Sequence, residues 1–114
     1  MSKPRKNVKK KKDTKDRRPS TPLTKEHAIL IGTKPVAAYV MACVTQFNQG
    51  AEVLVLKARG RAISRAVDVA EVLRRRFMKD LLEVTNIQID TEQIERTEGT
   101  LSNVSAIEIT LTRI

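Results

Sequence analysis

Three cations alternate with small residues in the stretch Lys57-Ala58-Arg59-Gly60-Arg61. An aliphatic run precedes this stretch and an amphipathic helical pattern follows it. Because side chains two residues apart on an extended chain share one face, we expect the three cations to point the same way beside the start of a helix. Lysine and arginine side chains in this position favour the binding of phosphate groups.

A second short turn, Gly32-Thr33-Lys34-Pro35, also joins a predicted strand to a predicted helix. In a parallel β-α-β unit both turns lie at the same sheet edge, next to two helix N-termini whose N–H groups can bind phosphate. Since aromatic residues make up only 3% of the chain, base stacking is a minor contribution. The pattern predicts contacts with the nucleic-acid backbone that depend on salt and depend little on base sequence. The alternative is that these turn charges are solvated and have no partner.

The charge is distributed very unevenly along the 114 residues, which suit one domain. Residues 1–22 hold ten Lys or Arg and two Asp, a net charge of +8, whereas residues 23–114 hold twelve Lys or Arg and eleven Asp or Glu, a net charge of +1. We therefore predict a disordered basic tail over 1–22, which attracts nucleic acid, and a folded domain over 23–114. A solvated tail without a specific role and a nuclear address are the alternatives.

The remaining chemistry excludes several classes of protein. Cys43 is the only cysteine and His27 the only histidine, so neither a disulfide nor a His/Cys metal site is expected. No catalytic motif is present, and no apolar run approaches the ~20 residues of a membrane span. We expect a cytoplasmic protein that is not an enzyme, uses no cofactor and binds neither a membrane nor a small-molecule substrate.

The hydrophobic periodicity predicts the element order βαβαββ. The fold class is an α/β (α+β) two-layer sandwich, in which both helices cover one face of a four-stranded mixed sheet. The last two strands form a long C-terminal hairpin whose tip extends beyond the body, with a bulge near Thr85-Asn86. The expected strands are 27–31 (short and buried), 52–58, 82–95 and 104–114, and the expected helices are 35–48 and 62–77. The first helix should have one continuous apolar face, formed by Val36, Val40, Cys43, Val44 and Phe47.

The second predicted helix has two apolar strips and a basic end. We expect its inner face to consist of Ile63, Ala66, Val67, Ala70, Leu73 and Phe77. Val69 and Val72 would form a separate strip, either as part of a wide buried face or as a surface for a partner subunit. Glu71 is four residues before Arg75, a favourable spacing for an ion pair. Arg74–Arg76 and Lys79 suit either the helix dipole or nucleic-acid contact.

Several of these motifs together resemble the Alba family of archaeal chromatin proteins. The resemblance runs from about Thr24 to the C-terminus and depends on three motifs: Ile31-Gly32-Thr33-Lys34-Pro35 followed by Tyr39-Val40, Asn48-Gln49-Gly50 and the block from Leu56 to Asp68. It implies a small dimer, as a homodimer or a heterodimer with a paralogue, that coats double-stranded DNA and also binds RNA. It further implies dimer–dimer contacts on DNA, hairpins that reach along the minor groove, and a cytoplasmic location on the chromosome.

The family's site residues transfer to this chain position by position. The second of the family's paired lysines matches Lys34, and Thr33 replaces the first, so regulation by acetylation at that position is in doubt. The family's dimer–dimer phenylalanine matches Phe77. The full predicted nucleic-acid-binding set is Thr33, Lys34, Lys57, Arg59, Arg61, Arg65 and Arg96, the last of these in the hairpin loop.

Three functions are compatible with these residues. The leading hypothesis is a non-enzymatic chromatin protein that coats and compacts double-stranded DNA without strong sequence preference. The second is an RNA-binding component of a ribonucleoprotein particle. The third is a nuclease, which the absence of catalytic motifs disfavours.

Overall fold

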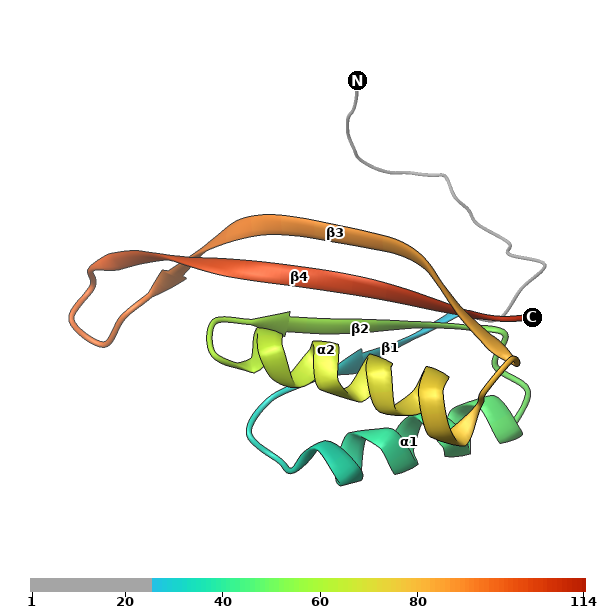
Figure 1. Cartoon of the computed structure of the whole chain (residues 1–114). Helices are drawn as coiled ribbons and strands as arrows, with labels where there is room; N and C mark the ends of the chain where they lie inside the picture. The colour runs from blue at the N-terminus through green and yellow to red at the C-terminus, as the bar shows by residue number, and fades with distance from the viewer. Residues whose placement is uncertain (1–25) are drawn as a thin grey trace, which may run out of the picture.

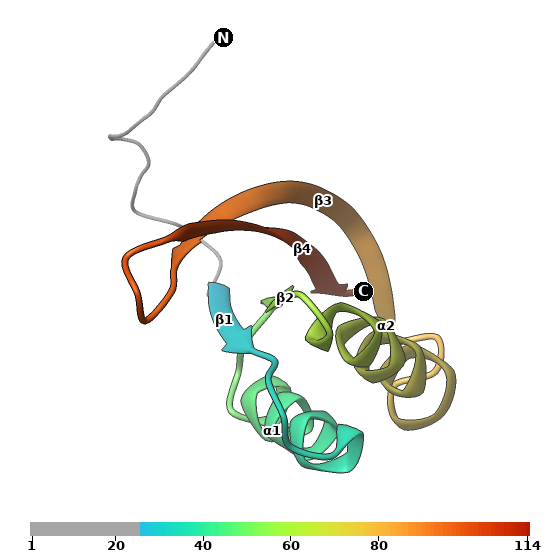
Figure 2. The same ribbon diagram turned by 90° about the vertical axis from the view of Figure 1, so that its left-hand side faces the viewer.

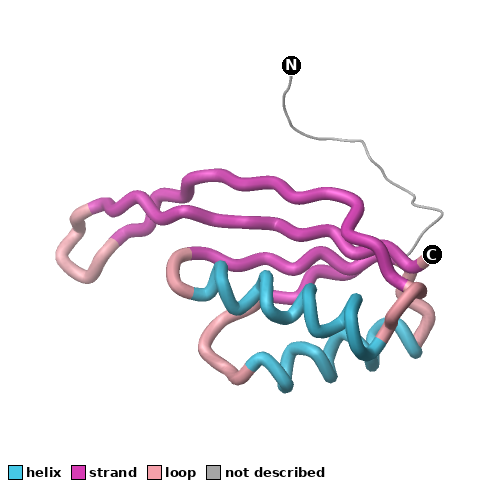
Figure 3. Tube along the Cα trace, in the orientation of Figure 1, coloured by secondary structure: helices cyan, strands magenta, loops and turns pink. Residues whose placement is uncertain are grey.

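The computed structural model describes residues 26–114, so the tail predicted over 1–22 lies outside the described residues. The elements in chain order are β1 (Glu26–Leu30), α1 (Val36–Asn48), β2 (Val53–Arg59), α2 (Ala62–Val72), a π-helical turn η2 (Leu73–Phe77), β3 (Leu82–Glu95) and β4 (Leu101–Arg113). This order confirms the predicted βαβαββ fold, and Figure 3 shows the helices on one side of the strands.

One mixed sheet, with strand order β1-β2-β4-β3, forms the upper layer in Figure 1. β1 and β2 are parallel, whereas β4 is antiparallel to both β2 and β3. The β3–β4 hairpin extends beyond the rest of the molecule, as predicted (Figure 1). Its register shifts between Val84 and Asn86, which confirms the predicted bulge. In the described part of the chain, no helix is long and apolar enough to cross a membrane.

The core is aliphatic and lies between the sheet and the two helices. Alternate residues of β2 and β4 face the helices: Leu54, Leu56, Ala58, Ile107, Ile109 and Leu111. Val40, Cys43 and Phe47 of α1 are buried against them, which confirms the predicted apolar face of the first helix. Burial raises the pKa of the Cys43 thiol to about 12, so this cysteine is a core residue and not a nucleophile.

The first strand is less buried than expected. We predicted a buried strand, but among residues 26–114 β1 lies at the edge of the sheet and pairs with β2 alone. Its last residue, Leu30, is 75% exposed, because it points away from the helices and no other strand of the described residues lies on its outer side. Ile31, just past the strand, is the residue that enters the core.

The buried face of α2 is rotated from the predicted one. Val69 is fully buried, whereas Val67 is 41% exposed, so Val69 belongs to the core and Val67 does not. The buried positions, Ala66, Val69, Ala70 and Leu73, follow the three- and four-residue steps of a single helical face. Both faces were apolar in the sequence, and the positions of α1 and the sheet determine which one is covered (Figure 2).

The predicted helix 62–77 changes its winding at Leu73. The N–H of Met78 donates to the carbonyl of Leu73 at 2.7 Å, a five-residue step that defines a π turn. This wider turn places both Leu73 and Met78 in the core and leaves Phe77 53% exposed. The expectation that Phe77 lies on the inner face is therefore wrong.

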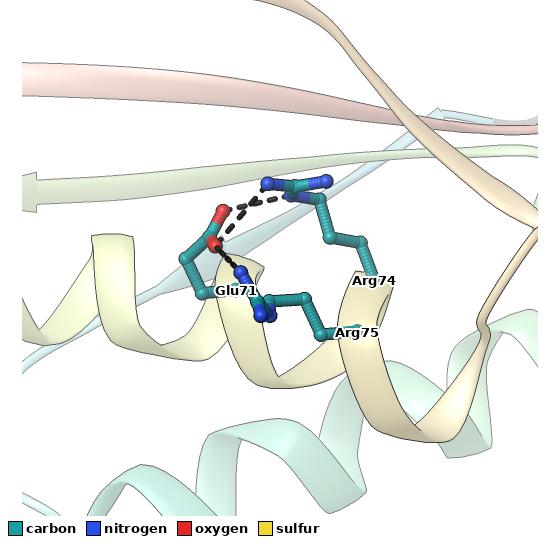
Figure 4. Close-up of polar contacts among 3 residues, drawn as sticks. All are labelled: Glu71, Arg74 and Arg75. Atoms are coloured by element: carbon teal, nitrogen blue, oxygen red, sulfur yellow. Dashed lines mark hydrogen bonds and ion pairs between the residues drawn. The ribbon is translucent and has the colours of Figure 1, made fainter.

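Glu71 forms ion pairs on the outer surface of α2, shown in Figure 4. Its carboxylate accepts two hydrogen bonds from Arg74, at 2.7 and 3.2 Å, and lies 3.9 Å from Arg75. The expected partner, Arg75, is thus the weaker one. The hydrogen bond from Arg74 lowers the pKa of Glu71 from its ordinary value, even though partial burial opposes the shift.

Candidate nucleic-acid interface

The carboxyl ends of β1 and β2 bring the two predicted turns together. Leu30 lies beside Lys57 in the parallel register, and the N–H of Ile31 donates to the carbonyl of Lys57 at 2.8 Å. Each turn leads into a helix, α1 and α2, and neither N-cap residue, Pro35 or Arg61, makes a side-chain capping bond. In the first turns, the N–H of Ala38 donates to the carbonyl of Pro35 and the N–H of Ile63 to the carbonyl of Gly60. The remaining first-turn N–H groups can face solvent or an anion.

Tyr39 and Arg65 fasten the turn between β1 and α1. The phenolic oxygen of Tyr39 accepts hydrogen bonds from the backbone N–H groups of Gly32, at 2.8 Å, and Lys34, at 3.1 Å. Arg65 reaches across from α2 and donates to the carbonyl of Gly32 at 2.6 Å. Burial raises the pKa of Tyr39, but the two N–H donors and the charges of Lys34 and Arg65 more than offset it, so the net shift is downward.

Gly60 makes the turn between β2 and α2. Its φ of +60° lies in the left-handed region, which a residue without a Cβ adopts at little cost. Its N–H donates to the carbonyl of Ser105 on β4 at 2.9 Å, and its carbonyl accepts from the N–H of Ile63 in the first turn of α2. These hydrogen bonds attach the turn to β4 in the sheet and to α2, the helix that follows it.

The cations of the second turn divide into two groups. Lys57 and Arg59 alternate with core residues of β2, so both project from the sheet face that the helices do not cover. Arg61 does not continue this alternation, because the turn at Gly60 ends the extended chain and Arg61 has helical dihedral angles. The prediction of a shared direction therefore applies to two of the three cations.

Two carboxylates lie against the cations of the uncovered sheet face. Arg59 Nη1 is 3.1 Å from Glu92 Oε1 on β3, and Lys57 Nζ is 3.8 Å from Glu108 Oε2 on β4. All four side chains remain substantially exposed to solvent, so the pairs are surface ion pairs of small energy. The uncovered face at this point combines both signs of charge.

A groove of about 730 Å³ runs along this edge of the molecule. Among the residues predicted to bind nucleic acid, those that line it are Thr33, Lys57, Arg59, Arg61 and Arg65. Lys34 is exposed in the same turn as Thr33 but does not line the groove. Arg96 lies apart in the hairpin loop, where its Nε donates to Ser102 Oγ at 2.9 Å, and Phe77 lies at the far end of the second helix.

Comparison with known proteins gives a consistent result. The family model described as Alba matches residues 27–91. The chain is 57% identical over 88 residues to "DNA/RNA-binding protein Alba 1" of Archaeoglobus fulgidus, a match that covers 77% of this chain and 97% of that relative. It is 54% identical over 91 residues to "DNA/RNA-binding protein Alba" of Methanocella arvoryzae, with 80% and 94% of the two chains covered. The chain belongs to the Alba family.

Solved structures of Alba proteins have the same fold. Alba from Thermoplasma volcanium matches with a TM-score of 0.71 and 50% identity, over 75% of this chain and 99% of that one. ALBA1 from Trypanosoma brucei matches with a TM-score of 0.60 at 23% identity, over 75% of this chain and 68% of that one, and shows the fold alone. Alba proteins are nucleic-acid-binding architectural proteins and not enzymes, which agrees with the sequence prediction.

Sequence reasoning missed three residues of this Alba site. Tyr39 was noticed only as part of a motif, although its spacing of five residues from Lys34 suits a contact between a helix and the turn before it. Glu92 and Glu108 were not connected with the cations, because their pairing depends on the register of strands far apart in the sequence. The alternation in β4 gave a partial indication, because it places Glu108 on the sheet face away from the core residues.

Proposed function

We propose that this Alba-family chain is a chromatin protein that coats and compacts double-stranded DNA through its phosphate backbone. Lys34, Lys57, Arg59 and Arg61 supply most of the contact, with Thr33 and the hairpin residue Arg96 as additional ligands. RNA is a second ligand, and the protein is located in the cytoplasm on the chromosome. Residues 1–22, with a net charge of +8, add attraction that does not depend on base sequence.

One observation supports this proposal above the others. Cations from two turns lie at one sheet edge, beside the N-termini of two helices without side-chain caps. Backbone N–H groups and cationic side chains together favour phosphate, whichever base it belongs to. The relatives' names, which describe DNA/RNA-binding proteins, support the same class of ligand.

Arg65 has a different role from the other cations in this proposal. Its guanidinium already donates to the carbonyl of Gly32, and its side chain is half-buried. We infer that it positions the turn that holds Thr33 and Lys34, and that it contacts phosphate only with its remaining donors.

We also propose that the chain acts as a dimer and that dimers contact one another through Phe77. β3 is an edge strand of the described sheet. Its Ile87 and Ile89 point to the same side of the sheet as the helices, and their side chains are 59% and 77% exposed. Two neighbouring isoleucines on an unpaired edge favour burial against a second copy of the chain. Phe77, 53% exposed at the far end of the second helix, is free to contact a neighbouring dimer.

RNA as the main ligand, in a ribonucleoprotein particle, is the second candidate. The relatives' names include both nucleic acids and therefore do not decide between them. Competition between duplex DNA and a structured RNA at matched salt separates the two functions. A preference of more than about 100-fold for RNA would favour the ribonucleoprotein role.

The substitution Arg59→Ala tests the backbone contact. We expect weaker binding to all duplex sequences by a similar factor, because a phosphate contact reads no bases. The plot of log affinity against log salt should become shallower by up to about one per protomer, since one fewer phosphate is neutralised. Fluorescence anisotropy with duplexes of several sequences, at four or more salt concentrations, measures both quantities.

Arg113→Ala is a matched control for this experiment. Arg113 lies at the opposite end of the sheet, where its guanidinium donates to the carbonyl of Phe47, so its loss should leave the salt slope unchanged. A change in sequence preference with Arg59→Ala, at an unchanged salt slope, would contradict the backbone model.

A further inference from the structure

The ion pairs of the uncovered sheet face occupy the same cations that the proposed function assigns to phosphate. Arg59 lies 3.1 Å from Glu92, and its guanidinium makes a hydrogen bond to that carboxylate. A phosphate oxygen that contacts the same donor must displace the carboxylate or lie beside it. Carboxylate and phosphate oxygens are equivalent acceptors for a guanidinium, so the two compete directly.

The position of Glu92 adds repulsion to this competition. Glu92, Asp90 and Glu108 all line the groove that contains the predicted cations. Residues 26–114 contain eleven Lys or Arg and eleven Asp or Glu, so this part of the chain has no net positive charge to attract phosphate over a longer range. A phosphate in the groove meets these carboxylates at close range, where salt screens the repulsion only in part.

The side chains are exposed enough for exchange to take place. The side chains of Arg59 and Glu92 are 58% and 50% exposed, and a surface pair of this kind is worth little to stability. The pair can therefore open without disturbing the fold. The ion pair affects binding instead. When a phosphate takes the place of Glu92 on Arg59, the carboxylate is left unpaired beside the nucleic acid.

We propose that Glu92 sets the affinity of the interface by competing with phosphate for Arg59. The inference depends on the proposed binding of nucleic acid and names a residue that limits it. In the free protein Glu92 neutralises Arg59, and in the complex its carboxylate is released and takes up a counterion. This uptake partly cancels the counterion release that favours binding, so the salt dependence of the native chain is shallower than its cations alone would produce.

The full-length variant Glu92→Gln tests the proposal, because glutamine keeps the shape and removes the charge. We expect about two- to fivefold tighter binding per protomer to duplex DNA of random sequence at low salt, the size of a weak surface pair. The slope of log affinity against log salt should become steeper. Glu83→Gln is the matched control: Glu83 is also on β3 and exposed, and it makes no ion pair among the described residues.

A double-mutant cycle assigns the effect to Arg59. If Glu92 acts through that side chain, Glu92→Gln should change affinity much less in the Arg59→Ala background than in the native chain. Equal effects of Glu92→Gln and Glu83→Gln would show a general charge effect and would overturn the proposal. Unchanged or weaker binding by Glu92→Gln would overturn it as well.

Elution from a heparin column separates failure of this inference from failure of the proposed function. The Glu92→Gln and Glu83→Gln chains have the same net charge, so later elution of the first reports a more available Arg59 without any nucleic acid. If neither the native chain nor Glu92→Gln binds duplex DNA, the proposed function fails. Later elution of Glu92→Gln than of Glu83→Gln would still support the competition between carboxylate and anion for Arg59. Identical elution of the two variants would overturn the competition itself.

Discussion

Tyr39 shows how a single side chain determines the shape of the site. Its phenolic oxygen is the acceptor for two backbone N–H groups, those of Gly32 and Lys34, in a turn that has no regular secondary structure. Tyr39 is itself buried at the start of α1. The turn therefore has a defined position relative to the helix, and Thr33 and Lys34 are presented from a fixed backbone.

The substitution Tyr39→Phe should lower the free energy of unfolding by about 1–2 kcal/mol, because it leaves two partly buried N–H groups without their acceptor. Urea denaturation measures the change. Thr112→Val is the control, since it removes a hydroxyl whose contact with Thr85 is exposed, and its effect should stay within about 0.5 kcal/mol. Native-like stability of Tyr39→Phe would mean that solvent replaces the phenolic oxygen.

At the scale of elements, the second helix and the hairpin each combine opposite charges. The last turns of the helix hold Arg74–Arg76, and Glu71 binds the first two of these arginines (Figure 4). β3 holds Asp90, Glu92 and Glu95 on its way to the hairpin loop, where Arg96 is the cation. The hairpin is thus an acidic arm, which agrees with our proposal that the two turns supply the main contact with phosphate.

The ion pair of Glu71 predicts a pH dependence of stability. Its pKa is lowered in the folded chain, chiefly by the hydrogen bond from Arg74, so the pair stabilises the fold above the ordinary value of 4.5 and less as the pH falls below it. Glu71→Gln should lower the melting temperature by roughly 2 °C at pH 7, and the difference should shrink as the pH falls through the lowered pKa of Glu71.

Thermal unfolding at several pH values measures this difference. Glu83→Gln makes the same change of charge at a position without an ion pair among the described residues, so its effect should be smaller at pH 7. A difference between Glu71→Gln and the native chain that persisted undiminished at pH 3 would contradict the role assigned to the carboxylate.

At the scale of the molecule, the sheet has one edge that is short and one that is long. β1 has five residues and β3 has fourteen, and it is β3 that exposes Ile87 and Ile89. The proposed phosphate site lies at the ends of β1 and β2, and Asp90 and Glu92 of β3 also line its groove. Ile87 and Ile89 lie on the opposite face of β3, toward the side of the helices. A dimer formed through β3 would therefore leave the predicted cations of both copies uncovered.

The substitution Ile89→Glu should convert the proposed dimer to a monomer, because it places a charge in an apolar contact between copies. Sedimentation or light scattering should give twice the chain mass of 12.8 kDa for the native protein and the single mass for the variant. Leu101→Glu is the control, as Leu101 is exposed at the hairpin loop. A native protein that is a monomer at micromolar concentration would contradict the dimer.

The sequence by itself determined the order of elements, the bulge, the apolar face of α1 and the positions of the two cationic turns. These features are local: periodicity, glycine position and charge spacing act over a few residues, so they can be read without knowing what packs against them. The block around Lys57 and Arg59 also identified the family, because it combines a strand end, a glycine turn and a helix start in one short segment.

Only the tertiary structure decided which apolar strip of the second helix is buried, that Arg65 binds Gly32, and that Glu92 and Glu108 lie against Arg59 and Lys57. Each of these contacts joins segments far apart in the chain, and strand register and helix rotation set them. The cations of the central stretch look unopposed in the sequence because their partners are 33 residues or more away along the chain. The fold closes that distance, and it brings Glu92 and Glu108 together with the cations that we propose bind phosphate.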